Sequence, residues 1–158
     1  MMNPDNLQVF TDEMLRAAGF GLGFLAVVLL LNTFFFMQIF FWFMRSSEKL
    51  TKPAPYKLIG RFMGAVLLMC IVQIMAILLW ATAIYTHSLI DNIRVAMLFA
   101  GSCYTTLGIF SDILPTGWQS LAFYIAFSGL FSIAIATSAM MAMLSTVSKR
   151  LYKSKSAL

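Results

Sequence analysis

Charged residues are scarce in this chain of 158 residues. Only 11% of them are Asp, Glu, Lys or Arg, whereas 61% are hydrophobic. A soluble domain is about a quarter charged and about half apolar. The mean hydropathy of +0.87 therefore argues against a water-soluble protein and indicates an integral membrane protein. The length predicts one membrane domain and no separate soluble domain.

Cysteine and histidine are also rare, which bears on catalysis and metal binding. Cys70 and Cys103 lie inside apolar runs, where buried thiols are expected, and His87 stands alone. No Cys/His cluster has the spacing of a metal site, so no cofactor is expected. The long apolar segments hold no Asp, Glu or His at depth that would form a nucleophile–base pair or a proton relay. We therefore predict that the chain is not an enzyme.

The net charge of +5 comes largely from basic residues that flank hydrophobic segments. One group lies within residues 45–61 and the other within residues 149–155. This pattern is typical of membrane topology, whereas a nucleic-acid-binding domain would need a basic groove and a fold that presents it. We expect membrane lipids as partners, and no nucleic acid.

Three hydrophobic segments are long enough to cross a bilayer. They occupy residues 20–43, 58–85 and 119–144. At about 1.5 Å per residue the shortest covers about 36 Å, against a hydrocarbon core of about 30 Å. We predict an all-α membrane protein with three transmembrane helices.

The distribution of Lys and Arg predicts the orientation of these helices. Residues 44–57 and the tail at residues 146–158 carry the basic excess, so both are expected to be cytoplasmic. Three spans then leave residues 1–19 as a short external segment and residues 86–118 outside. A bacterial inner membrane is the simplest compartment with this rule.

Several residues within the spans carry specific expectations. Asn32 should find a hydrogen-bond partner in a neighbouring helix, because an amide in hydrocarbon needs one. Trp80 and Tyr85 suit an aromatic belt at the membrane interface. Gly129 lies in mid-span, where it would either permit a bend, acting as an inner-helix hinge, or allow close helix packing.

Residues 86–118 differ in character from the three spans. Asp91 or Asn92 suits the N-cap of a helix. The apolar run over residues 95–110 covers only about 24 Å, too short for a comfortable span, and small polar residues interrupt it. Pro115 and Gly117 then end the segment. Non-helical backbone at membrane depth is tolerated only inside protein or beside a water-filled cavity, so we predict a re-entrant pore helix and loop over residues 91–118.

The end of this segment resembles the selectivity filter of the potassium-channel superfamily. Thr105-Thr106-Leu107-Gly108 is similar to the Thr-Thr-Val-Gly that opens the family filter, and Asp112-Ile113-Leu114-Pro115 is similar to its Asp-x-x-Pro exit, with Trp118 following. The resemblance covers residues 58–145. It implies an outer helix over 58–85, an inner helix over 119–144, and residues 20–43 as an additional helix.

The middle of the filter departs from the family pattern Gly-Tyr-Gly-Asp. The chain reads Gly108-Ile109-Phe110-Ser111-Asp112, which has one more residue and no second glycine. A glycine there permits left-handed dihedrals that turn successive carbonyls toward the axis, and Phe110 would be strained in that conformation. The upper ion sites are therefore expected to be absent or remodelled, while residues 106–108 would still supply a lower site.

Two functional interpretations follow. In the first, the chain is a homotetrameric channel for monovalent cations, since one pore loop per chain requires several copies around an axis. Potassium is implied by the resemblance alone. Asp112 would form a carboxylate ring that concentrates cations, or it is an ordinary loop residue. In the second interpretation, the chain is a non-conducting accessory or scaffold subunit with a degenerate pore loop. The ion-pathway residues of the first interpretation are Thr105, Thr106, Leu107, Gly108, Ile109, Phe110, Ser111 and Asp112.

Overall fold

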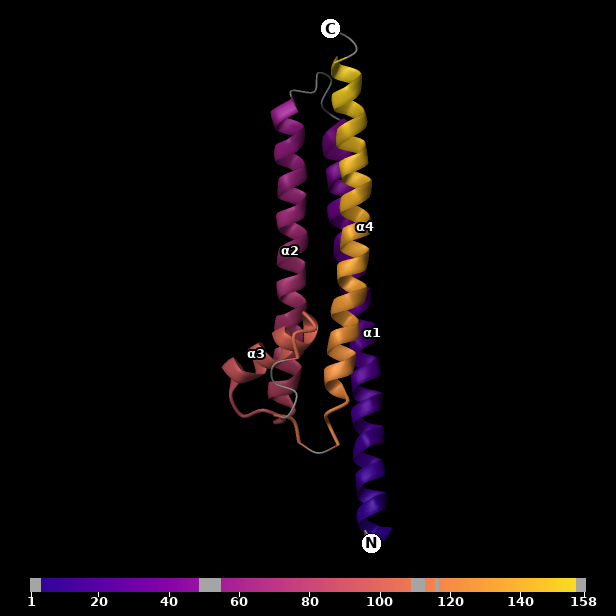
Figure 1. Ribbon diagram of the computed structural model, residues 1–158, viewed down its shortest axis with the longest axis vertical. Helices are drawn as coiled ribbons and strands as arrows, with labels where there is room; N and C mark the ends of the chain where they lie inside the picture. The colour runs from indigo at the N-terminus through magenta and orange to yellow at the C-terminus, as the bar shows by residue number, and fades with distance from the viewer. Residues whose placement is uncertain (1–3, 49–54, 109–112, 116, 156–158) are drawn as a thin grey trace. The chain divides into compact units, whose positions relative to one another are not determined.

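The computed structural model describes residues 4–48, 55–108, 113–115 and 117–155, and the side chains of residues 13–48, 56–108, 113–115 and 117–152. The regular structure within these ranges is α-helical. Four helices follow one another along the chain: α1 (Pro4–Glu48), α2 (Pro55–Thr86), α3 (Ile93–Tyr104) and α4 (Leu121–Lys155). Figure 1 shows α1, α2 and α4 as long helices and α3 as a short one.

Three of these helices are long and apolar enough to cross a membrane. The candidate spans are Glu13–Glu48, Tyr56–Thr86 and Leu121–Tyr152. The predicted all-α class is confirmed, with three long apolar helices and a shorter helix between the second and the third. By length and composition, the three spans indicate an integral, multi-pass membrane protein.

Helices α1 and α4 extend beyond the predicted apolar segments. α1 begins at Pro4 rather than near residue 20, and α4 continues to Lys155 rather than ending near residue 144. Hydropathy marks where a segment becomes polar, but the ladder of backbone hydrogen bonds can continue past that point. Pro4 and Pro55 each stand at the first position of a helix, where a missing N–H leaves no hydrogen bond unmade.

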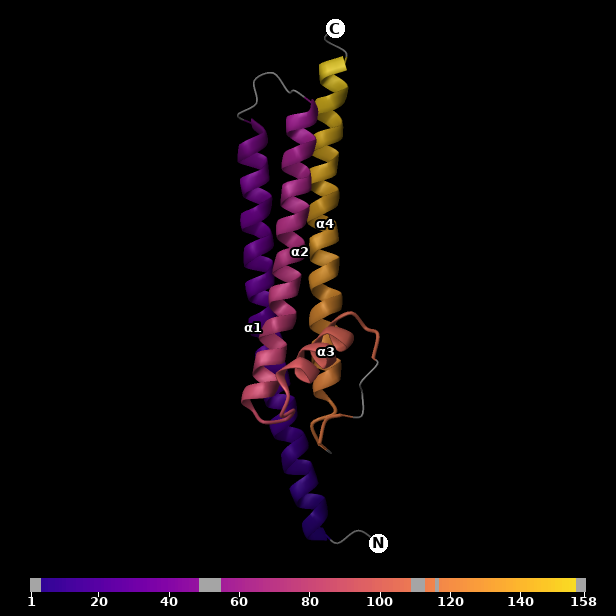
Figure 2. The same ribbon diagram turned by 90° about the vertical axis from the view of Figure 1, so that its left-hand side faces the viewer.

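The described chain divides into two compact units, the first containing Met1–Leu30 and Met75–Phe131. Its core forms where α3 packs on the segments of the three long helices that belong to this unit. The largest fully buried side chains there are Trp80, Ile84, Phe99, Tyr104, Leu121 and Ile125. Figure 2 shows α3 lying across the end of α2 and the start of α4.

The second unit contains Leu31–Ile74 and Ser132–Leu158. Its largest buried side chains are Phe36, Phe43, Leu58, Met69 and Met143. The Asn32 side-chain amide donates a hydrogen bond of 2.7 Å to the hydroxyl of Ser132 on α4, and both residues are buried. The expectation that Asn32 binds a neighbouring helix is confirmed.

Two arginines of the second unit contact the C-terminal end of α1. Arg61 of α2 donates to the backbone carbonyl of Ser46, and Arg150 of α4 donates to that of Ser47 over 2.6 Å. The last four carbonyls of a helix have no partner within it, and a cation is favourable at that end because of the helix dipole. These two basic residues thus cap α1, a role that the charge pattern of the sequence did not indicate.

Candidate pore loop

The short helix α3 begins at a well-defined N-cap. Asn92 has extended backbone dihedrals, and its side-chain oxygen accepts a hydrogen bond of 2.9 Å from the Arg94 amide. This contact satisfies one of the amide groups that lack a partner in the first turn. Of the two predicted caps, Asp91 and Asn92, the structure selects Asn92, and α3 starts at Ile93.

The C-terminal end of α3 is closed by a Schellman motif. The Thr106 amide donates to the Cys103 carbonyl over 2.9 Å, and the Leu107 amide donates to the Ser102 carbonyl over 2.8 Å. These are the two bonds that define this helix ending. The Gly108 amide also donates to the Ser102 carbonyl, over 3.2 Å. The chain therefore reverses direction at the filter-like residues instead of continuing the helix.

Two of these residues have left-handed backbone dihedrals. The φ angle is 61° at Thr106 and 64° at Gly108. Glycine adopts this conformation freely, whereas a β-branched residue there is an outlier. Residues held in such conformations cost about 1–3 kcal/mol and cluster at functional sites. The strain at Thr106 thus marks the same position that the filter resemblance selected.

The residues of the turn are exposed, whereas the end of α3 before it is buried. Thr105, Thr106, Leu107 and Gly108 are all exposed. The Thr105 hydroxyl donates to the Gly101 carbonyl over 2.8 Å, which leaves its oxygen lone pairs available as acceptors. Cys103, one position before Tyr104, is a buried free thiol. The four predicted filter residues that are described thus form one exposed turn that follows the buried last residues of α3, Ser102, Cys103 and Tyr104.

Contacts with α4 show how far the C-terminal end of α3 lies from the start of α4. A Cβ atom added to Gly129 would lie 2.9 Å from the Tyr104 carbonyl carbon and closer still to its oxygen. Gly129 is about 12 Å along α4 from Leu121, at about 1.5 Å per residue. The C-terminal end of α3 therefore lies about two helical turns inside the start of α4 (Figure 2).

A contact with α2 gives a similar depth. A Cβ atom added to Gly101 would make an ordinary van der Waals contact with Ile77, at 3.7 Å. Ile77 precedes the end of α2 at Thr86 by about 14 Å, at about 1.5 Å per residue. The two helices that flank α3 thus both pass well beyond its C-terminal end.

A buried polar pair supports this arrangement. Trp80 of α2 is fully buried, and its indole N–H donates a hydrogen bond of 2.9 Å to the hydroxyl of Ser128, the residue before Gly129. The Ser128 hydroxyl donates in turn to the Ile125 carbonyl over 2.7 Å. The prediction that Trp80 belongs to an interfacial belt is wrong, because its ring is enclosed by protein. Tyr85, one turn further, is exposed.

The return from the turn to α4 is described only in part. Ile109, Phe110, Ser111 and Asp112 lie outside the described residues. Leu114 is buried in the core of the first unit. Gly117 has a φ of 103°, and a Cβ atom there would lie 3.2 Å from a carboxylate oxygen of Glu13 on α1.

Residues that sequence analysis did not select also surround this return. Glu13 approaches Gly117, and the Trp118 ring packs edge-on against Phe20 with a centroid distance of 6.3 Å. The start of α1 is therefore part of the structure beside the loop. No sequence signal pointed to this, since Glu13 fell within the predicted external segment.

Gly129 lies in an unbroken helix, since α4 runs from Leu121 to Lys155. The close approach of the Tyr104 backbone to Gly129 agrees with the predicted role in helix packing. The predicted role as a hinge stays a prediction. Among the residues whose side chains are described, no three His, Cys, Asp or Glu residues come together as metal ligands. The site therefore offers backbone carbonyls, hydroxyls and a helix C-terminus as its polar groups.

Comparison with protein-family models, with curated proteins and with solved structures finds no match to this chain.

Proposed function

We propose that this chain is the subunit of a pore-loop cation channel. The observation that carries the proposal is the turn at Thr105–Gly108, which contains two left-handed residues and follows a short helix that ends well inside the flanking spans. Irregular backbone at such depth needs a protein-lined or water-filled surrounding, and a conduction pathway supplies one.

The chemistry of the turn suits a cation. The C-terminal end of a helix carries a partial negative charge of about half an elementary charge. Carbonyl and hydroxyl oxygens at this end replace part of the hydration shell of a permeating ion. Thr105, Thr106, Leu107 and Gly108 offer such oxygens on an exposed turn. Asp112, at the filter exit of the sequence, would add a carboxylate that concentrates cations.

The selectivity proposed is for monovalent cations. The missing second glycine of the filter pattern argues against a complete set of potassium sites, and potassium itself is implied only by the resemblance. One pore loop per chain then requires several copies around an axis, and a homotetramer is the assembly that the resemblance implies. The orientation proposed has the N-terminus outside and the C-terminus in the cytoplasm of a bacterial cell, with the chain in the inner membrane.

A second candidate function is a non-conducting accessory subunit. The amides of Leu107 and Gly108 both return to the Ser102 carbonyl, so the turn closes on α3 rather than extending as a row of carbonyls. A degenerate loop of this kind would serve packing alone, and the chain would act through a partner protein.

Purified protein in liposomes distinguishes the two functions. A channel gives a cation current whose reversal potential follows the potassium or sodium gradient, and it behaves as a tetramer in native mass spectrometry. A subunit without flux in either gradient, found as a monomer or only with a partner, supports the accessory function and contradicts the channel.

A matched pair of glycine variants then links any current to the turn. A Cβ atom at either Gly108 or Gly64 meets nothing within 4 Å, but only Gly108 has a positive φ. A left-handed conformation costs an L-residue about 1–2 kcal/mol, and about 1.4 kcal/mol corresponds to tenfold. Gly108→Ala should therefore reduce the flux about tenfold, and Gly64→Ala should leave it unchanged.

A further inference from the structure

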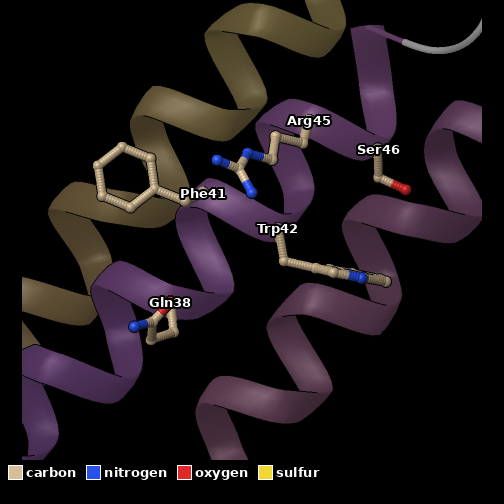
Figure 3. Close-up of a pocket in the computed structure, with 5 residues that line it drawn as sticks. All are labelled: Gln38, Phe41, Trp42, Arg45 and Ser46. Carbon is tan, nitrogen blue, oxygen red and sulfur yellow. The ribbon is translucent and has the colours of Figure 1, made fainter.

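A hollow lies on the surface of α1, over the last turns before its C-terminal end at Glu48. Its volume is ≈ 360 Å³. The residues that line it are Gln38, Phe41, Trp42, Arg45 and Ser46 (Figure 3). Their spacing of three and four residues is the repeat of one helix face. The hollow belongs to the second unit and is separate from the turn at the end of α3.

The part of the hollow nearest the C-terminal end of α1 is positively charged. Arg45 lines it, and the guanidinium of Arg61 donates to the backbone carbonyl of Ser46, which lines it too. A guanidinium holds a phosphate through two parallel hydrogen bonds. Gln38, about two helical turns from Arg45, adds a side-chain amide to the lining. The exposed ring of Trp42 is of the type that lies at the level of lipid headgroups.

At its other end, near Gln38, the hollow continues into an exposed apolar stripe on α1. Phe34 and Phe35 lie three to four residues before Gln38, Leu31 lies three to four residues before them, and all three side chains are exposed. From Arg45 to Leu31 the helix covers about 21 Å, more than half of a hydrocarbon core of about 30 Å. A chain of methylene groups lying on this stripe would cross a whole leaflet.

We propose that this hollow binds the headgroup of an anionic glycerophospholipid of the cytoplasmic leaflet, with its phosphate on Arg45 and an acyl chain along Phe41, Phe34 and Leu31. The pairing of a guanidinium with an apolar stripe selects a lipid over a free phosphate or a peptide. The leaflet follows from the basic excess at this end of the spans, and that leaflet is the anionic one. The proposal is independent of whether the chain conducts.

The fluorescence of Trp42 provides the test, because this ring lines the hollow. The full-length protein is placed in bilayers of equal phosphatidylglycerol and phosphatidylcholine, and one lipid or the other carries a brominated acyl chain, which quenches tryptophan. Subtracting the signal of Trp42→Phe removes the contributions of Trp80 and Trp118. Arg45→Gln is the test variant. Lys57→Gln is the matched control, since Lys57 is an exposed basic residue of the same unit that does not line the hollow.

The expected result is stronger quenching of Trp42 by brominated phosphatidylglycerol than by brominated phosphatidylcholine. One basic residue near an anionic surface changes lipid affinity about fivefold, so this preference should fall about fivefold in Arg45→Gln and persist in Lys57→Gln. Soluble glycerol phosphate should not reduce the preference for phosphatidylglycerol, because glycerol phosphate lacks an acyl chain.

Four outcomes would overturn the proposal. Equal quenching by the two lipids in the unmodified protein would mean that no anionic headgroup is selected. An unchanged preference in Arg45→Gln, or an equal fall in both variants, would leave only the general attraction of a basic surface. Quenching by neither lipid would mean that a second copy of the chain covers the hollow.

Discussion

The backbone carbonyl of Tyr104 occupies the space that a side chain at residue 129 would need. A Cβ atom on Gly129 would lie 2.9 Å from the carbonyl carbon and 3.2 Å from the Tyr104 Cα atom. The obstacle is backbone of the last turn of α3, which a rotamer change cannot move. Because Tyr104 immediately precedes the filter-like turn, this contact fixes the distance between that turn and α4.

Gly129→Ala should therefore destabilise the first unit. Overpacking of a tight contact costs roughly 1–3 kcal/mol, and here α3 as a whole must shift. The measurement is thermal unfolding in detergent, followed by tryptophan fluorescence. Gly23→Ala is the control, because Gly23 is helical and a Cβ atom there meets nothing within 4 Å. It should raise the free energy of unfolding by about 0.5–1 kcal/mol. A Gly129→Ala variant as stable as the control would mean that α3 does not approach α4 this closely.

The sequence predicted the elements of this fold well, because each has a local signal. Hydropathy located three spans, an apolar run of insufficient length located the short helix, and Asn92 marked its start. The hydrogen bond of Asn32 to another helix could also be predicted, since an amide in an apolar segment has few other groups to bind.

The contacts between elements were not predictable in the same way. Trp80 resembles a belt residue in sequence, and only the placement of Ser128 beside it explains its burial. From the sequence, Arg61 and Arg150 only indicate which side of the membrane their segments face, although each also caps α1. The left-handed conformation of Thr106 depends on where α3 ends, which propensity alone does not determine to the residue.

The Trp80–Ser128 hydrogen bond should show measurable coupling. Hydrogen-bonded pairs between transmembrane helices couple by about 0.6 kcal/mol on average, and by up to about 1.7 kcal/mol. A double-mutant cycle of Trp80→Phe with Ser128→Ala, read by thermal unfolding in detergent, measures this term. Ser138→Ala is the control partner, since its exposed hydroxyl donates to the Ala134 carbonyl of its own helix. Coupling of the same size with Ser138 would show that the term does not come from the hydrogen bond.

Arg150 should protect the last turn of α1. Arg150→Met keeps the apolar stem but removes the donor to the Ser47 carbonyl. A cation at a helix C-terminus contributes about 0.3–1 kcal/mol, so hydrogen exchange of the amides at residues 45–48 should accelerate by up to about fivefold. Lys149→Met, at the neighbouring exposed position, should leave exchange unchanged. Equal acceleration in both variants would assign the effect to net charge rather than to capping.

Thr106 allows the strain of the turn to be separated from its chemistry. Thr106→Gly should stabilise the protein by roughly 0.5–2 kcal/mol, because relief of about 1–3 kcal/mol of strain exceeds the added entropy of the unfolded chain. Thr82→Gly is the control. Thr82 is an exposed residue inside α2, where the same change should destabilise by a few tenths of a kcal/mol. Thermal unfolding in detergent measures both.

Thr106→Val completes the comparison, since it keeps the β-branch and removes the hydroxyl. Its stability should equal that of the unmodified protein within about 0.5 kcal/mol, as is usual for exposed positions. If the turn lines an ion pathway, the loss of a coordinating oxygen should reduce the cation flux into liposomes in this variant, although its backbone strain is unchanged. Full flux in Thr106→Val would show that the Thr106 hydroxyl does not contact the permeating ion. Such a result would leave the backbone carbonyls of Thr106 and its neighbours as the groups that contact the ion.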